Sequence, residues 1–187
     1  MSIEKQMKVA DEVINKLRAV DPFCIVAGGA PRDWYFGNTA NDIDVYSWQQ
    51  HNTQHSKIKQ LKYAGFDCSP VGYEYNREMY EKNAMIEAVF NVSCYEFSVQ
   101  IISLNCKTFK VVDTSPFSIC QAWYTPERGI QLERNFKLTE KTGCIFRTNP
   151  VYADGDKYIK KIEERFKDKF KFARSKEEAM QRYIENN

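Results

Sequence analysis

The 187-residue sequence has no long hydrophobic run, and no apolar stretch approaches the roughly 18 residues that a membrane-spanning helix requires. The N-terminus also lacks the basic-then-apolar order of a secretory signal peptide. Cysteine occurs six times but never as a CxxC pair, so neither a disulfide framework nor a zinc site is indicated. These absences argue against membrane-embedded and disulfide-stabilised secreted proteins, and we expect a cytoplasmic protein with reduced thiols.

Histidine is also scarce, because the chain contains only His51 and His55. The two residues lie four positions apart on an expected helix and could share one face. No glutamate follows His51, and no third ligand lies close by in the sequence. We therefore expect no zinc centre.

The composition otherwise fits an ordinary folded domain, with 43% hydrophobic and 28% charged residues. A chain of this length can bury a sizeable core as one domain with, at most, a small appendage. The composition shifts near residues 125–134, which predicts a boundary there. We expect one domain over residues 1–125 and a helical, basic extension over residues 126–187 packed on it.

Positive charge is concentrated in this extension. Residues 157–176 contain nine Lys or Arg and three acids, a net charge of +6, whereas the whole chain carries +2, leaving −4 for the remainder. Such asymmetry suits contacts to nucleic-acid phosphates, although a Lys-rich solvated helix face has the same composition. The candidate residues for binding a nucleic-acid acceptor are Lys157, Lys160, Lys161 and Lys167.

Two carboxylates, Asp42 and Asp44, lie one residue apart between the apolar residues Ile43 and Val45. Successive side chains of a strand point to opposite faces, so the two aspartates share one face and the apolar residues are buried on the other. Carboxylates held side by side repel each other, and a divalent cation would offset that cost. The pattern predicts a metal site at Asp42 and Asp44.

A phosphate-binding turn is predicted just upstream. Residues 23–27 are apolar and suited to a strand, Gly28 and Gly29 permit a tight turn, and residues 32–36 form a short helix that Gly37 ends. A strand, a glycine turn and a helix start together present backbone donors to phosphate. Arg32 adds a cation beside them.

The stretch GGAPRDWYFGNTANDIDVY, residues 28–46, resembles the signature of the polymerase-beta-like nucleotidyltransferases. It is most similar to GGxxRDxxxG followed by DxD in the head domain of CCA-adding enzymes and bacterial poly(A) polymerases. The matching residues are Gly28, Gly29, Arg32, Asp33, Gly37, Asp42 and Asp44. The resemblance implies an α+β fold, a polymerase-like palm in which helices flank a mixed sheet, with a short helical C-terminal extension.

The resemblance also implies an activity: Mg²⁺- or Mn²⁺-dependent, template-independent transfer of NMP from an NTP to a hydroxyl acceptor through two metal ions. Asp42 and Asp44 would hold the metals, and Gly28, Gly29 and Arg32 would bind the triphosphate. Asp33 belongs to the same nucleotide-binding signature and is expected to orient Arg32 or the start of the helix rather than contact substrate. The expected acceptor is an RNA 3′ end.

Periodicity predicts the elements around this signature. Apolar residues at three- and four-residue steps predict a helix over residues 3–17, and residues 56–64 form a second helix closed by Gly65. The runs at 84–92 and 96–104 predict an antiparallel hairpin. A spacing of four predicts another helix in the extension, with an apolar stripe of Tyr158, Ile162, Phe166 and Phe170.

The predicted hairpin offers two positions for a third residue at the metal site. Glu87, in IEAVFN, resembles the acid-bearing VEVATFR strand of the related heads, although Asn91 replaces the final arginine. Gln100, in VQIISL, is the competing position and would leave only two acids, because an amide is a poor metal ligand. We predict Glu87 as the third catalytic acid.

Other features depart from the family pattern. The stretch SPFSICQA at residues 115–122 resembles a degraded RDFTINA motif in which Pro116 replaces the aspartate, and no EDxxR-like motif can be placed. The long helical body that holds RNA in these families also has no room here, so the chain resembles a minimal member. Two alternatives stay open: transfer to a protein or small molecule, and a degenerate nucleotide-binding module. The sequence does not indicate an oligomeric state.

Overall fold

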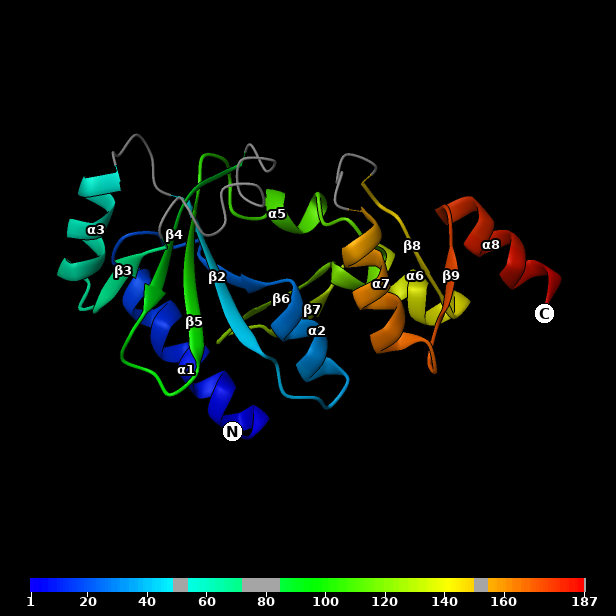
Figure 1. Ribbon diagram of the computed structural model, residues 1–187, viewed down its shortest axis with the longest axis horizontal. Coiled ribbons are helices and arrows are strands. Elements are labelled where there is room, and N and C mark those ends of the chain that lie inside the picture. The colour runs from blue at the N-terminus through cyan, green and yellow to red at the C-terminus, as the bar shows by residue number, and fades with distance from the viewer. Residues whose placement is uncertain (49–53, 72–84, 150–154, 187) are drawn as a thin grey trace.

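A mixed seven-stranded sheet forms the centre of the molecule, with helices packed against it (Figure 1). The structure, a computed structural model, describes residues 1–48, 54–71, 85–149 and 155–186. It confirms the predicted α+β fold in which helices flank a mixed sheet. The helices are α1 (Ile3–Leu17), α2 (Gly29–Tyr35), α3 (Gln54–Tyr63), α5 (Lys110–Asp113), the 3-10 helix η1 (Ser118–Cys120), α6 (Arg134–Thr142), α7 (Gly155–Phe166) and α8 (Lys176–Glu185).

The sheet has the strand order β3-β4-β5-β2-β1-β6-β7. Strands β2 and β5 run parallel, and each of the other neighbouring pairs is antiparallel. The predicted hairpin is confirmed as β4 and β5. The strands are β1 (Ile25–Ala27), β2 (Asp42–Trp48), β3 (Cys68–Pro70), β4 (Ile86–Val92), β5 (Ser98–Leu104), β6 (Ala122–Thr125), β7 (Gly129–Leu132), β8 (Cys144–Phe146) and β9 (Lys171–Ala173).

The main hydrophobic core lies between one face of this sheet and α1. Ile43 and Val45 of β2 are fully buried there, together with Ile14 and Leu17 of α1. The predicted stripe of α1 is therefore confirmed, and the side chain of Ser2 caps the helix by accepting a hydrogen bond from the Lys5 N–H. Because β2 alternates, its aspartates lie on the opposite face of the sheet.

A buried glutamine fixes the connection between α2 and β2. Gln6 Oε1 accepts hydrogen bonds from Trp34 Nε1 at 2.8 Å and from the Ala40 N–H at 2.9 Å. Gln6 Nε2 donates to the Ala40 carbonyl at 2.9 Å. A buried amide with all these partners satisfied holds its neighbours in one arrangement. α1 thereby positions both α2, the helix within the GGxxRD signature (hereafter the signature helix), and the start of β2.

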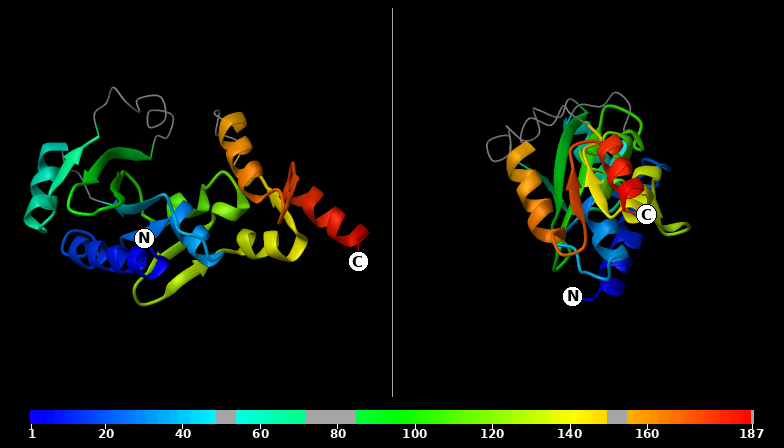
Figure 2. Two further views of the ribbon diagram at one scale, coloured as in Figure 1. Left: turned by 60° about the horizontal axis from the view of Figure 1, so that its bottom comes forward. Right: turned by 90° about the vertical axis from the view of Figure 1, so that its right-hand side faces the viewer.

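The C-terminal extension is helical as predicted, with α6, α7 and α8. It also contains a parallel pair of short strands, β8 and β9, beside these helices. The expected boundary between residues 125 and 126 falls in the turn between β6 and β7, and β7 remains hydrogen-bonded to the large sheet. Figure 2 shows α8 at the opposite end of the molecule from α3.

A second core joins this extension to the signature helix. Phe36, at the end of α2, packs its ring 5.8 Å from Phe136, 5.6 Å from Phe166 and 5.8 Å from Phe170, measured between ring centroids. The buried members of this second core are Phe117, Ile119, Cys120, Ala122, Phe136, Ile145, Ile162, Phe166 and Phe170. Of the predicted apolar stripe, Ile162, Phe166 and Phe170 are confirmed as buried, and the side chain of Tyr158 lies outside the described residues.

None of the helices in the described segments is long and apolar enough to cross a membrane.

Because Phe36, which follows α2, and Ala122 of β6 pack in the second core with residues of α6 and α7, we predict that the extension and the large sheet unfold together. The Phe166→Ala substitution should lower the free energy of unfolding by about 3–5 kcal/mol. Chemical denaturation followed by tryptophan fluorescence and circular dichroism should give one transition for both probes. Ile184→Ala is the control, because Ile184 is 66% exposed and its loss should change stability little. Two separate transitions would show that the extension folds on its own.

Candidate active site

The two aspartates predicted to bind metal lie at the start of β2. Asp42 is exposed and Asp44 is partly buried. Burial and the charge of Asp42 raise the pKa of Asp44 to about 7, and the positive charge of Lys161 opposes that rise. A divalent cation would relieve the repulsion between the two carboxylates, so this donor set fits Mg²⁺ or Mn²⁺.

Two amide side chains lie beside Asp42 and Asp44, which we call the acid pair. Gln100 of β5 is the register partner of Asp44, and Asn91 of β4 is the register partner of Gln100. Gln100 Nε2 donates a hydrogen bond to Asn91 Oδ1 at 3.0 Å. Residues paired in register share a face of the sheet, so these three side chains form a polar row, Asp44, Gln100 and Asn91, across three strands.

Glu87 does not join this polar row. It lies at a bulge of β4 near Ser103, which pairs with Ser47 of β2. Ser47 follows Asp44 by three residues, which is roughly 10 Å along a strand. Glu87 instead forms an ion pair with Lys57 of α3. The register therefore separates Glu87 from Asp42 and Asp44, and it places Gln100 of β5 beside Asp44.

Lys57 explains why Glu87 is held where it is. Its side chain is 2% exposed, and α3 packs on the main core through Leu61. That core lies on the sheet face opposite the aspartates. Among the residues that the structure describes, no group of three or more His, Cys, Asp or Glu side chains is placed to hold a metal ion.

The glycine turn forms where it was predicted. Gly28 has φ = 83°, a conformation that favours glycine, and α2 begins at the next residue, two positions before Pro31. The Gly28 N–H donates to the Ala122 carbonyl at 3.2 Å, which ties the turn to β6. Because β1 pairs with β2 through Val26 and Val45, the turn that follows β1 lies near the start of β2.

Arg32 and Asp33 form a buried cluster behind this turn. Arg32 Nε donates to Asp33 Oδ1 at 3.0 Å, and the two side chains are 5% and 4% exposed. The second oxygen of Asp33 contacts Arg165 Nη2 at 2.8 Å, and the Arg32 guanidinium also contacts Cys120 Sγ and the ring of Phe166. The expectation that Asp33 orients Arg32 agrees with this contact. Sequence reasoning missed Arg165, because its partner lies 132 positions earlier.

The stretch SPFSICQA contributes packing and hydrogen bonds to the second core. Ser118 is fully buried, with its hydroxyl 2.6 Å from Thr139 Oγ1, and it accepts a hydrogen bond from the Phe146 N–H. Phe117 and Ile119 are buried beside it. This segment thus connects α6 and β8 to the region behind the glycine turn.

Three of the four lysines predicted to bind the acceptor have described side chains. Lys160, Lys161 and Lys167 are exposed, and the positive charge of Lys161 acts to lower the pKa of Asp44, against the effects of burial and of Asp42. The side chain of Lys157 lies outside the described residues, as do His51 and the side chain of His55.

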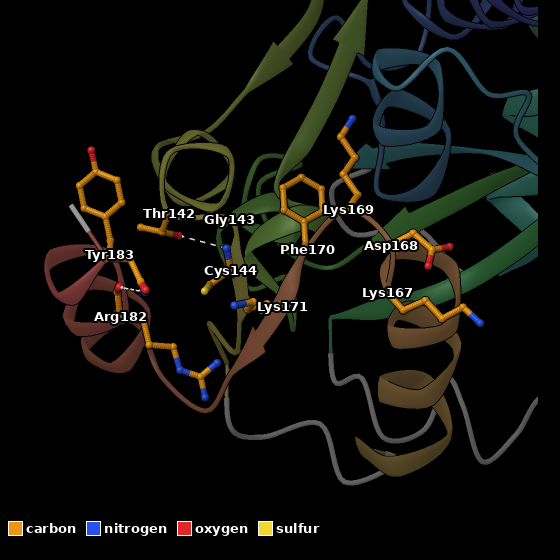
Figure 3. Close-up of a pocket in the computed structure, with 11 residues that line it drawn as sticks. Thr142, Gly143, Cys144, Lys167, Asp168, Lys169, Phe170, Lys171, Arg182 and Tyr183 are labelled. Carbon is orange, nitrogen blue, oxygen red and sulfur yellow. Dashed lines mark hydrogen bonds between the residues drawn. The ribbon is translucent and has the colours of Figure 1, made fainter.

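A basic pocket of about 440 Å³ lies farther along the extension, lined in part by Lys167, Lys169, Lys171 and Arg182. Figure 3 shows Lys167 and Arg182 on opposite sides, pointing away from each other. Lys169 Nζ lies 3.9 Å from the centroid of the Phe36 ring, and Arg182 is hydrogen-bonded to the Phe172 carbonyl and to Glu178. Because these cations do not converge and no acid pair lies among the lining residues, the candidate catalytic site remains at Asp42 and Asp44.

The raised pKa of Asp44 predicts a pH dependence of stability without metal. Native Asp44 keeps a proton up to about pH 7, whereas the unfolded chain releases it near pH 3.9. The free energy of unfolding should therefore fall as the pH rises between these values. Asp44→Asn should remove this fall and stabilise the metal-free protein at pH 8 by about 1–2 kcal/mol.

Denaturation curves at pH 4 and pH 8, with and without Mg²⁺, test this prediction. Mg²⁺ should stabilise the wild type at pH 8 and leave the Asp44→Asn protein unchanged. Asp168→Asn, at an exposed position of the extension, is the charge-matched control. Identical pH profiles for the wild type and the Asp44→Asn protein would contradict the arrangement.

The strand register predicts opposite roles for Glu87 and Gln100. Glu87→Gln leaves the buried Lys57 ammonium without its carboxylate partner and should cost about 2–3 kcal/mol of stability, with Mg²⁺ affinity unchanged. Gln100→Glu adds a carboxylate next to Asp44 and should raise Mg²⁺ affinity severalfold. Calorimetric Mg²⁺ titration and denaturation measure both quantities. A folded Glu87→Gln protein that has lost Mg²⁺ binding would show that Glu87 takes part in the metal site after all.

No protein-family model and no curated protein matches this sequence. Solved structures do match. A CCA-adding enzyme in an apo form superposes with a TM-score of 0.63 at 16% identity, over 98% of this chain and 43% of that chain. The Thermotoga maritima CCA-adding enzyme complexed with tRNA gives 0.58 at 16%, over 100% of this chain and 46% of that chain.

A tRNA nucleotidyltransferase complexed with a primer tRNA and an incoming ATP analog gives a TM-score of 0.53 at 16% identity, over 87% of this chain and 47% of that chain. The chain thus spans less than half the length of these neighbours. At such identities the similarity concerns the fold alone. The chain has a nucleotidyltransferase head-domain-like fold, resembling the head domains of CCA-adding enzymes.

Proposed function

We propose that this chain is a Mg²⁺- or Mn²⁺-dependent nucleotidyltransferase that transfers NMP from an NTP to a hydroxyl acceptor. The observation that carries the proposal is the acid pair: Asp42 and Asp44 share one sheet face, next to the glycine turn, and burial together with the charge of Asp42 raises the pKa of Asp44. A fold similar to those of CCA-adding enzymes supports it. In this role Asp42 and Asp44 hold the metal ions.

In the proposed reaction, the acceptor oxygen bonds to the α-phosphorus as the bond to pyrophosphate breaks. Bound Mg²⁺ would polarise the α-phosphate and lower the pKa of the attacking hydroxyl. Asp42 and Asp44 fix the position of this charge on the sheet face. The Gly28 turn leaves open space where a side chain would otherwise project, so that a phosphate could approach the backbone. Catalysis of this kind depends on positioning and electrostatics.

An RNA 3′ end is the acceptor that we propose. Two of the solved neighbours are complexes with tRNA, and the extension of this chain carries the +6 charge of residues 157–176. Lys160 and Lys167 are exposed there and available for phosphate contacts. A protein or small-molecule acceptor is the second candidate, because a solvated Lys-rich helix face has the same charge as a surface that binds RNA.

Incubating the protein with Mg²⁺, each labelled NTP, and total RNA or protein extract tests the proposal. We expect label in RNA with the wild type, and a loss of at least about 100-fold with Asp44→Asn because that change removes a charge that positions the metal. Asp168→Asn again serves as the charge-matched control.

The fraction that takes up the label decides between the candidates. Label in protein or in a small molecule would support the second candidate. Absence of transfer with every NTP would favour a non-catalytic nucleotide-binding module. Full transfer activity in the Asp44→Asn protein would instead overturn the assignment of Asp44 to the metal site.

A further inference from the structure

The polar row of Asp44, Gln100 and Asn91 continues onto a fourth strand. Ser69 of β3 is the register partner of Asn91, so the row crosses β2, β5, β4 and β3, a width of roughly 14 Å at the usual strand spacing. Ser69 and Asn91 are exposed, and Gln100 is half-buried. Beyond Asp44 the members of the row carry no charge. This part of the sheet face therefore suits groups that form neutral hydrogen bonds rather than phosphates.

The sheet face opens to solvent at this row. In the next row along the same strands, Tyr46, Ile102 and Val89 pair in register. They pack in a hydrophobic cluster that includes Val111 of α5, and Val89 and Ile102 are only 5% and 3% exposed. The segment around α5 thus covers the face beside the polar row, whereas the row itself is accessible to a ligand.

A hydrogen bond fixes the orientation of the Gln100 amide. Gln100 Nε2 donates to Asn91 Oδ1 at 3.0 Å, so the amino end of the amide faces β4. The carbonyl oxygen Oε1 is the other end of this planar group, and it accepts hydrogen bonds. Gln100 pairs in register with Asp44, one strand spacing away. A group bound at this amide would therefore adjoin whatever the acid pair holds.

The glycine turn and the two amides lie on opposite sides of β2. The sheet order places β1, which ends at the glycine turn, on one side of β2, and β5 and β4 on the other (Figure 1). In the proposed transfer the leaving pyrophosphate lies at the glycine turn, and an in-line displacement brings the attacking hydroxyl from the opposite side. The acceptor therefore approaches over β5 and β4, where Gln100 and Asn91 lie.

We infer that Gln100 binds the 2′-hydroxyl of the acceptor's terminal ribose, so that the site selects an RNA end over a deoxyribose end. The inference rests on the proposed nucleotidyl transfer to an RNA 3′ end. The 2′-hydroxyl is the neighbour of the attacking 3′-hydroxyl on the ribose ring, and it can donate a hydrogen bond to Gln100 Oε1. Asn91 is a positioning residue, because it acts through the Gln100 amide.

Two oligonucleotides test the inference: an RNA, and the same RNA with a single 2′-deoxyribose at its 3′ end. The wild type should extend the all-ribose RNA with a kcat/KM about fivefold higher, the usual effect of one hydrogen bond between neutral groups. Gln100→Leu should lower this kcat/KM by the same factor and leave that of the deoxy-ended RNA unchanged, because both changes remove one hydrogen bond. The KM for NTP should not change.

Variants of Asn91 separate positioning from a purely structural role. Asn91→Leu should also reduce the preference for the all-ribose RNA. Asn91→Asp keeps an oxygen that accepts from Gln100 Nε2 and should retain the preference. Gln131→Leu is the matched control, because Gln131 is a half-buried glutamine of β7, on the glycine-turn side of the sheet, and its loss should leave the preference intact. Melting temperatures check that each variant is folded.

The inference and the proposed function can fail separately. Transfer to RNA that depends on Asp44, with equal use of the two oligonucleotides by the wild type, overturns the inference alone. A preference that survives Gln100→Leu, or an equal loss with both oligonucleotides in that variant, also overturns it. A wild type that labels only protein or small molecules removes the inference together with the RNA acceptor. A wild type that transfers no nucleotide to any acceptor overturns both proposals.

Discussion

The buried carboxylate of Asp33 holds the two parts of this molecule in register. One oxygen accepts a hydrogen bond from Arg32 in the same helix, and the other contacts Arg165 of α7. A carboxylate that is 4% exposed is stable only with such partners, and loss of either partner would leave a buried charge uncompensated. The relation between the glycine turn and the C-terminal extension therefore depends on this cluster, and the phenylalanines of the second core pack around it.

This arrangement assigns different tasks to charges that look equivalent in the sequence. Arg32 and Arg165 are structural partners of Asp33, Lys169 lies over the Phe36 ring, and Lys160, Lys161 and Lys167 are exposed. A patch with a net charge of +6 is thus not one uniform binding surface. Its contribution to any ligand depends on which residues the docking of α7 leaves exposed, and on which side of the helix they lie.

The local features of the site could be predicted from sequence, because they depend on near neighbours in the chain. Alternation placed Asp42 and Asp44 on one face, the paired glycines marked the turn, and spacing marked α1 and the hairpin. The register of the strands could not be predicted: the parallel pairing of β2 with β5 places Gln100 beside Asp44, while Glu87 lies at a bulge of β4, and no local pattern marks either feature. The contact of Arg165 with Asp33 was equally hidden, since the two residues lie 132 positions apart in the sequence.

The long reach of these contacts has a consequence for synthesis of the chain. The glycine turn and the acid pair are complete by residue 46, and their immediate neighbour β5 by residue 104, but Arg165 and Phe166 follow much later. A nascent chain emerges from the ribosome N-terminus first, so Asp33 gains its second arginine partner only after residue 165 has been made. Until then Phe36 also lacks its ring contacts with Phe166 and Phe170, so α2 reaches its final surroundings late in synthesis.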